Sequence, residues 1–339
     1  MQNLKKSTLI ILFIILTGCS LTPAPPPVVA PKVPPANTLP PAPTITQEIQ
    51  PTFTTAPTQS PSVTPTEEIA QEPVQGIILF IGDGMGANQR LAAQWLALGT
   101  DFKLAMDSMP VLGFSSTRAA NRIITDSAAG GTAIASGVKA NYRHVGLDPD
   151  NNIIPTILEQ AKQQGWSTGL ISTVQLAHAT PATFAAHVDD RSDMTEIARQ
   201  IIDNNVDVLL GGGENDFLPG GEQGCFPNYG HQPVGINPLN TALSMGYQLV
   251  CSANELQALN AGETPKLIGF FGDEQIISPF SPTLAEMTRK AIEILSQNEN
   301  GFFLMVEAGQ IDWAGHNKEG QDNLDFTVGL DLAVIEAQL

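Results

Sequence analysis

Cysteine is scarce in this sequence, whose 339 residues include only Cys19, Cys225 and Cys251. Three cysteines are too few for the framework of bridges that holds small disulfide-rich domains together. The fold must therefore rest on a hydrophobic core, and a content of 42% hydrophobic residues is enough to build one. Two alternatives stay open for Cys225 and Cys251, which could pair in an oxidising compartment or remain free.

Basic residues are also few. The 16 Lys and Arg residues stand against 34 Asp and Glu residues, which gives a net charge of -18. This charge disfavours nucleic acid and anionic membrane surfaces as partners. An acidic protein can still act on an anionic substrate if bound cations reverse the local charge. The excess of carboxylates therefore indicates either metal binding or simply a soluble acidic surface.

The N-terminal region contains an apolar run that is too short for a transmembrane helix. This run, residues 9–16, follows Lys5 and Lys6 and precedes small residues and Cys19, a pattern typical of a secretory signal. The stretch Leu-Thr-Gly-Cys resembles a bacterial lipoprotein box, in which the cysteine is lipidated. We predict a lipoprotein signal peptide at residues 1–18 and lipidation of Cys19. The protein would then be exported and lipid-anchored to the cell envelope, on its periplasmic or extracellular face. An ordinary signal peptide with a chance cysteine is the alternative.

Large apolar side chains are rare between the predicted anchor and residue 74. This segment holds 15 of the 26 prolines, together with many threonines, alanines and valines. Such a composition cannot bury enough surface to offset the entropy lost on ordering, and proline stiffens the chain toward extended conformations. We predict a Pro/Thr-rich disordered spacer at residues 19–74 and a folded domain at residues 75–339.

From residue 76 onward, apolar runs alternate with helix-like stretches. The runs GIILFIGDG, STGLISTV, VDVLLGGG and GFFLMVEAG are typical of buried parallel strands. The alternation predicts an α/β fold with a mostly parallel central sheet and helices on both faces. Ligands bind such sheets beyond the carboxyl ends of the strands. The helix-like stretches are residues 88–98, 128–136, 153–164, 195–203 and 283–296.

Asp83 follows the first predicted strand, within the motif Gly-Asp-Gly-Met-Gly-Ala. This motif nearly matches a dinucleotide-binding fingerprint, a weak signal when it stands alone. A carboxylate between the first two glycines would face the pyrophosphate that the loop should bind, so the match is disfavoured. Asp83 fits better as a metal ligand, and a simple turn aspartate is the alternative.

Glu307, Asp312 and His316 follow the last predicted strand. The Asp-x-x-x-His spacing places both side chains on one face of a helix that begins near residue 311. A carboxylate and an imidazole from one helical turn suit a zinc ion. Glu307 lies at the strand end and points into the same crevice, although it need not bind the same ion. A helix cap would equally explain Asp312.

His178, Thr180 and Arg191 follow the strand GLISTV. His178 and Thr180 are two residues apart in a predicted extended segment, which puts them on one face. Arg191 comes after a short helical stretch, and its planar guanidinium matches the geometry of phosphate oxygens. Each of these residues alone could equally be a loop histidine, a cap before proline or a surface charge.

Ser127 stands directly after Asp126, at the start of a stretch of small residues. It is either a helix cap or a nucleophile. A serine hydroxyl becomes nucleophilic near neutral pH only with a neighbouring base, a positive field or a metal ion, and no histidine is adjacent to Ser127 in the sequence.

Five motifs, in this order, closely resemble bacterial alkaline phosphatases: IGDGMG, TDSAAGGTA, ATPATFAAHVDDR, LGGG and FFLMVEAGQIDWAGH. The resemblance runs from about residue 76 to residue 339. It implies hydrolysis of small phosphate monoesters through a phosphoserine intermediate, with two Zn2+ ions and one Mg2+ ion as cofactors. It is also compatible with a homodimer. A sulfatase is disfavoured because the sequence has no Cys-x-Pro-x-Arg motif, and a phosphodiesterase is a minor alternative.

The resemblance implies a role for each candidate residue. Ser127 matches the nucleophile, Arg191 matches the arginine that clamps the phosphate, and Asp126 matches the residue that orients this arginine. In the implied mechanism, zinc ionises the serine, and the helix dipole also favours negative charge there.

The remaining candidates match metal ligands of the family. Asp83 matches the carboxylate that bridges a zinc and the magnesium, and Thr180 and Glu307 match further magnesium ligands. Asp312 and His316 match ligands of the first zinc. Some family members have aspartate at the position of His178, and a histidine there could ligate directly and favour softer ions.

Part of the family pattern is missing from this sequence. The family completes its zinc sites with an Asp-His pair and a later histidine, but the chain has no Asp-His dipeptide and no histidine after His316. The sequence ends within the apolar-periodic stretch NLDFTVGLDLAVIEAQL. Two expectations follow: an N-terminal portion of a longer phosphatase, or a truncated and inactive surface lipoprotein that retains some metal or phosphate binding.

Overall fold

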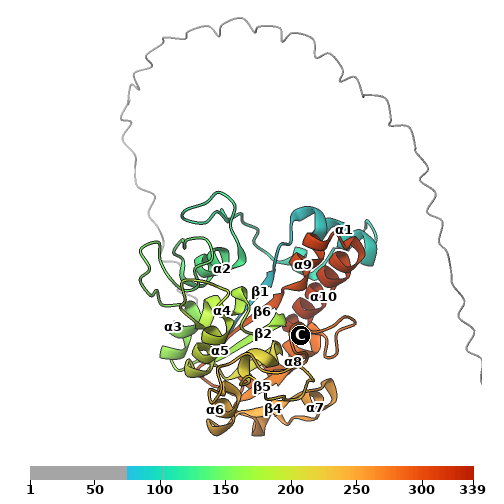
Figure 1. The fold of residues 1–339 in the computed structure, drawn as a ribbon. Helices are drawn as coiled ribbons and strands as arrows, with labels where there is room; N and C mark the ends of the chain where they lie inside the picture. Colours follow the sequence, from blue (N-terminus) through green and yellow to red (C-terminus); the bar gives the residue numbers. More distant parts are fainter. Residues whose placement is uncertain (1–74, 102) are drawn as a thin grey trace, which may run out of the picture. The chain divides into compact units, whose positions relative to one another are not determined.

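The computed structural model describes residues 75–101 and 103–339. The predicted signal peptide, Cys19 and the predicted spacer lie outside these residues. Within the described part, six strands form one sheet in the order β1-β6-β2-β3-β5-β4, and all neighbours are parallel (Figure 1). The predicted α/β fold with a mostly parallel sheet is confirmed. The strands are β1 (Gly76–Gly82), β2 (Ser167–Gln175), β3 (Val208–Gly212), β4 (Gln248–Val250), β5 (Leu267–Phe270) and β6 (Phe302–Ala308).

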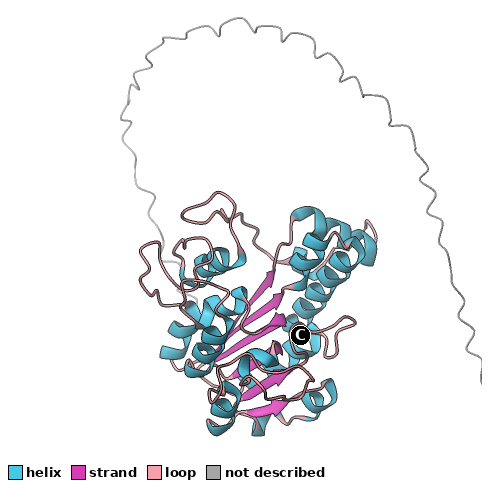
Figure 2. Ribbon diagram, viewed as in Figure 1, coloured by secondary structure: helices cyan, strands magenta, loops and turns pink. Residues whose placement is uncertain are grey.

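Helices cover both faces of this sheet (Figure 2). One face carries α2 (Ser127–Ser136), α3 (Ile157–Gln163), α4 (Ala179–Ala185), α5 (Met194–Asp203) and α6 (Pro238–Ser244). The other carries α1 (Ala87–Ala97), α7 (Ala253–Ala258), α8 (Leu284–Leu295), α9 (Gln310–Asn317) and α10 (Gly320–Gln338). Short 3-10 helices are η1 (Ala105–Ser108), η2 (Glu214–Phe217) and η3 (Ala261–Glu263). Among the described residues, none of the helices is both long and apolar enough to cross a bilayer.

The alternation of side chains along each strand divides the interior into two cores. On β6, Phe303 and Met305 pack with the helices of the α2–α6 face, whereas Phe302 and Leu304 pack with those of the opposite face. Both faces of β2, β3, β5 and β6 are therefore buried, whereas the edge strand β1 is only half-buried. This explains why the strands have continuous apolar sequences without the polar alternation of a half-exposed sheet.

Two features of the fold differ from the sequence-based expectation. Helix α3 begins at Ile157 rather than at residue 153, because Thr156 ends the preceding loop as the N-cap and its hydroxyl accepts a hydrogen bond from the Glu159 amide (3.1 Å). Ile153 instead forms a β-bridge with Leu147. Strands β4 and β5 were not predicted, since they are only three and four residues long.

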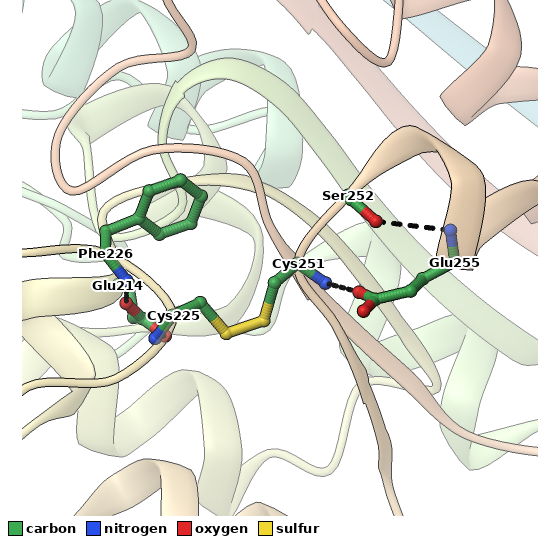
Figure 3. Close-up of a disulfide and its surroundings, with 6 residues drawn as sticks. All are labelled: Glu214, Cys225, Phe226, Cys251, Ser252 and Glu255. Carbon is green, nitrogen blue, oxygen red and sulfur yellow. Dashed lines mark hydrogen bonds between the residues drawn. A yellow bond between two sulfur atoms is a disulfide. The ribbon is translucent and has the colours of Figure 1, made fainter.

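A disulfide joins Cys225 to Cys251, with a Cα–Cα distance of 6.0 Å, so these cysteines pair rather than remain free (Figure 3). Beside it, the carboxylate of Glu214 accepts hydrogen bonds from the amides of Cys225 (2.8 Å) and Phe226 (3.0 Å). The bond connects the loop after η2 to the segment between β4 and α7.

Candidate active site

The candidate residues gather at the carboxyl ends of the three strands β1, β6 and β2. The parallel register pairs Ile81 of β1 with Glu307 of β6, and Glu307 in turn with Ser172 of β2. Asp83 directly follows β1, next to Glu307. The Ser172 hydroxyl donates to Glu307 Oε2 at 2.6 Å. This serine was missed from the sequence, although a polar residue inside an apolar strand was a usable signal.

Ser127 is the first residue of α2, but it does not cap the helix. The N-cap is Asp126, whose Oδ1 accepts a hydrogen bond from the amide of Ala129 (3.1 Å). The Ser127 hydroxyl is therefore not used for capping, and it donates to Asp83 Oδ2 at 2.8 Å. The structure thus brings Ser127 and Asp83 together from segments 44 residues apart in sequence.

Thr180 also reaches Asp83, because its hydroxyl donates to the same Oδ2 at 3.4 Å. The expectation that His178 and Thr180 share an extended segment is wrong. His178 has extended backbone dihedrals, but it is the N-cap of α4, and Thr180 is the second residue of that helix. Pro181 does not prevent the helix, since proline in the first turn has no hydrogen bond to lose there.

Arg191 is held from two sides. Its Nη1 donates to Asp126 Oδ2 (3.1 Å), and its Nη2 donates to His178 Nε2 (2.9 Å). The Arg191 and Asp126 side chains are only 19% and 10% exposed. One oxygen of Asp126, Oδ1, therefore caps the helix that carries Ser127, and the other, Oδ2, holds the arginine.

His178 accepts a hydrogen bond from a cation, which requires a neutral ring nitrogen. Burial, followed by the positive charge of Arg191, lowers the pKa of His178 to about 4. Its ring stands edge-on to Trp313 of α9, with ring centroids 5.8 Å apart. Its Nδ1 is buried without a partner among the described residues.

Asp312 and His316 lie one turn apart on α9, as the spacing predicted, with His316 Nε2 3.5 Å from Asp312 Oδ2. Gly84 makes the approach of this helix possible. A Cβ on Gly84 would lie 2.5 Å from Asp312 Oδ1, and Gly84 has a φ of +64°. The His316 side chain is 78% exposed, so it faces the open side of the site.

The carboxylates concentrate negative charge in the site. Burial raises the pKa of Asp83; the hydrogen bond from Ser127 opposes this rise and the charge of Asp312 adds to it. Burial, followed by the charge of Asp83, raises the pKa of Glu307 to about 8. Glu307 is fully buried, and its Oε1 has no partner among the described residues.

These properties fit bound cations. Asp83, Thr180 and Glu307 offer oxygen donors, which suit a hard ion such as Mg2+. Asp312 and His316 offer the mixed donors that suit Zn2+. A cation among the carboxylates would favour their ionised forms, against the burial and mutual repulsion that raise their pKa values.

The site opens into a cavity of about 1470 Å³, far larger than a phosphate group requires. Its lining includes Arg122, Lys139 and Tyr142, three residues that the sequence did not single out. The Arg122 guanidinium stacks 4.1 Å from the centre of the Tyr142 ring. No spacing or motif marked these residues, because only the fold of the 115–142 segment brings them to the cavity.

Comparison with known proteins identifies the family. The family model described as alkaline phosphatase matches residues 74–338. The chain therefore belongs to the alkaline phosphatase family, and the resemblance found in the sequence motifs is confirmed.

Individual relatives agree with this assignment. Alkaline phosphatase 4 of Bacillus subtilis (strain 168) is 35% identical over 263 residues, which cover 73% of this chain and 53% of that protein. Among solved structures, a cold-active alkaline phosphatase from the psychrophile Shewanella sp. is 30% identical, with a TM-score of 0.68 and coverage of 78% of this chain and 63% of that one. The chain spans about half the length of the Bacillus relatives that it matches.

A third similar protein was solved with a metal ion. It is a variant of the alkaline phosphatase from the Antarctic bacterium TAB5, with Mg bound in its M3 site. It is 26% identical to this chain, with a TM-score of 0.67, and the match covers 78% of this chain and 72% of the TAB5 chain.

Proposed function

We propose that this protein hydrolyses small phosphate monoesters through a phosphoserine intermediate on Ser127. The observation that carries the proposal is the arrangement around Asp126. The Ser127 hydroxyl is bonded to Asp83 rather than to a helix end, and the residue before it holds Arg191 at the same cavity. The start of α2 thus positions both the proposed nucleophile, Ser127, and the guanidinium of Arg191, which would bind the phosphate.

Each residue has a defined task in this proposal. The Arg191 guanidinium binds two nonbridging phosphate oxygens, since its planar fork matches them. Asp126 and His178 keep the guanidinium oriented through the contacts at 3.1 and 2.9 Å. The Ser127 hydrogen points to Asp83, so the oxygen lone pairs remain available to attack phosphorus. The attack breaks the bond between phosphorus and the ester oxygen, and the alcohol leaves. Water then cleaves the bond between phosphorus and Ser127 Oγ, which releases inorganic phosphate and restores the serine.

We further propose two zinc ions and one magnesium ion as cofactors. Asp83, Thr180 and Glu307 would hold the magnesium; Asp83 would also contact zinc, and Asp312 and His316 would hold zinc. The magnesium in the TAB5 variant supports this proposal. When bound, the metal ions would lower the pKa of the serine hydroxyl and stabilise negative charge on the departing oxygen. His178 lies next to this cluster, and it would shift the preference of the site toward softer ions if it ligated directly.

The experiment traps the intermediate. The protein is purified from the organism that makes it and is supplied with zinc and magnesium. It is then mixed with a 32P-labelled phosphomonoester, and the reaction is quenched in acid. We expect label on Ser127, located by peptide mass spectrometry, and no label in Ser127→Ala. Ser136→Ala, at the other end of α2, is the matched control and should keep the label. Label on another residue, at an undiminished level in Ser127→Ala, would refute the assignment.

We also propose that the domain is exported and anchored through lipidated Cys19, with residues 19–74 as the spacer. The support is the motif Leu-Thr-Gly-Cys after a basic and apolar segment. Radioactive palmitate should label the wild-type protein, and Cys19→Ala should lose the label and leave the membrane fraction. Equal labelling of both proteins would contradict the anchor. Cys225→Ala controls for labelling of a cysteine elsewhere.

A further inference from the structure

Arg143 has a backbone conformation that arginine rarely adopts. It is the third residue of a turn in which the His144 amide donates to the Asn141 carbonyl (3.1 Å), and its φ is +73°. A positive φ at the third position is typical of a type II turn, where glycine or asparagine usually stands. A larger side chain is strained there, and such strain persists only where surrounding contacts hold it. The contacts of Arg143 should therefore indicate why an arginine occupies this position.

The Arg143 side chain binds the residues on either side of Arg191. Its Nε donates to Asp190 Oδ2 (2.9 Å), and its Nη2 donates to Asp190 Oδ1 (2.6 Å) and to the Ser192 hydroxyl. The hydrogen bonds from Arg143, followed by that from the Ser192 amide, lower the pKa of Asp190, so this carboxylate is ionised near neutral pH. Because the contact with Asp190 has two points, it fixes the relative orientation of the two side chains as well as their distance.

The Arg143 backbone contacts the same site. Its amide donates to Asp126 Oδ1 (3.2 Å), and its carbonyl accepts from the Arg191 amide (3.0 Å). Arg191 completes a ring of hydrogen bonds, because its Nη1 donates to Asp126 Oδ2 (3.1 Å). Arg143 thus joins Asp126, the residue before Ser127, to the segment that carries Arg191.

We propose that Arg143 is a positioning residue for the guanidinium of Arg191, an inference that rests on the proposed function. Arg143 is not among the described residues that line the cavity at Ser127. It acts by fixing Asp190 and Ser192, and these neighbours determine where the Arg191 side chain begins. Glycine would suit the turn but could not make these contacts, which explains why the strained arginine is present.

A contribution to overall stability does not explain this arginine equally well. The Arg143 and Asp190 side chains are 39% and 48% exposed. Exposed ion pairs contribute little to the free energy of unfolding, and the turn itself favours a different residue. The effect of Arg143 is therefore expected in the order of the segment around Arg191 and in the affinity for phosphate, with little change in Tm.

The test compares wild type with Arg143→Asn, since asparagine tolerates a positive φ but is too short for the two-point contact with Asp190. Both proteins are purified from the producing organism and supplied with zinc and magnesium. Calorimetry measures the binding of inorganic phosphate, and mass spectrometry measures hydrogen exchange in the peptide that contains Arg191. We expect phosphate to bind Arg143→Asn roughly tenfold more weakly and the amides of this peptide to exchange faster. Arg143→Lys, which keeps the charge but not the planar fork, should recover only part of the loss.

Asp190→Asn separates positioning from long-range charge. Removal of a negative charge near the site would by itself strengthen the binding of an anion. Under the proposal, Asp190→Asn should instead weaken phosphate binding, because an amide cannot accept hydrogen bonds from both guanidinium nitrogens. A protein with Arg143→Asn and Asp190→Asn together should be no weaker than the weaker single variant, since both changes break the same contact.

Arg199→Gln is the matched control, because it removes a partly exposed arginine whose ion pair with Glu196 lies within α5. It should change neither phosphate affinity nor exchange at Arg191. Hydrogen exchange requires neither phosphate nor turnover, so it keeps this inference distinct from the proposed function. Wild type that neither binds phosphate nor turns over a phosphomonoester would refute the proposed function. Unchanged exchange at Arg191 in Arg143→Asn would overturn the positioning role, and so would unchanged or tighter phosphate binding by Asp190→Asn.

Discussion

Asp126 is the residue on which the proposed catalytic arrangement depends most directly. One of its oxygens caps α2 and accepts hydrogen bonds from the amides of Ala129 and Arg143, and the other accepts from Arg191. The sequence indicated Asp126 only through the family resemblance, as an arginine-orienting residue. Its second task, capping the helix of the proposed nucleophile, frees the Ser127 hydroxyl.

These two tasks can be separated by substitution. Asp126→Asn should keep the cap, since asparagine caps as well as aspartate, but weaken the hold on Arg191. A hydrogen bond to a charged group contributes about 1.5–3 kcal/mol, so we expect inorganic phosphate to inhibit the variant roughly ten- to hundredfold more weakly, with an unchanged Tm. The inhibition constant and a thermal melt measure the two effects. Asp189→Asn, an exposed aspartate two residues from Arg191, is the control. An equal change in this control would contradict the orienting role.

At the scale of elements, the sequence predicted four neighbouring strands of the sheet but not β5 and β4, which follow them on one side. The long runs of β1, β2, β3 and β6 are apolar on both faces, which is typical of parallel strands; β2, β3 and β6 are buried, and β1 at the edge of the sheet is half-buried. Strands β4 and β5 have too few residues to show a pattern. The helical state of Thr180 was hidden because proline usually signals an interruption.

The arrangement of the candidate residues could be predicted where their spacing in the sequence places them on one face of a helix. Asp312 and His316 were placed correctly because residues four apart share a helix face. The Ser172–Glu307 and Arg191–His178 contacts could not be predicted in this way, since they depend on strand register and on the path of the loop after α4. Arg122 and Tyr142 meet only through tertiary folding.

A partly buried ion pair links α3 to the segment after α4, and it should make stability depend on pH. His187 Nδ1 faces the Gly146 carbonyl (2.8 Å), and Nε2 faces Glu159 Oε1 (2.9 Å). Both contacts are satisfied only by the protonated ring. Burial opposes the charge, but these hydrogen bonds prevail and raise the pKa of His187 above its usual 6.5. The stabilisation is therefore complete below pH 6.5 and is lost as the pH rises through the raised pKa.

We expect the free energy of unfolding of wild type, relative to His187→Gln, to fall between pH 6 and pH 9 by at most about 1 kcal/mol. Denaturant unfolding at several pH values measures this difference. Glu159→Gln should remove the same dependence, because glutamine keeps the capping box but not the charge. The account fails if the difference between wild type and His187→Gln is flat over this range.

At the scale of the whole molecule, both faces of the sheet are well covered, yet one segment of the described chain exposes large apolar side chains. Between α1 and α2, five of them are each more than four-fifths exposed. They are Val111 (84%), Leu112 (86%), Phe114 (98%), Ile123 (90%) and Ile124 (81%). Exposed apolar surface of this kind marks interaction sites or a tendency to aggregate. This segment also adjoins the cavity at Ser127, which Ile123 and Ile124 help to line.

We therefore expect a protein comprising residues 19–339 to self-associate through this segment, because association removes apolar surface from water. Replacing Phe114 and Ile124 together by serine should lower the mean molar mass measured by light scattering at high protein concentration. The far-ultraviolet circular dichroism should not change, since neither side chain belongs to a buried core. Val234→Ser, at a side chain that is 87% exposed in a different loop, is the matched control and should associate like wild type. If the control and the double variant reduce association equally, any exposed apolar side chain replaced by serine has the same effect, and the segment has no special part in association.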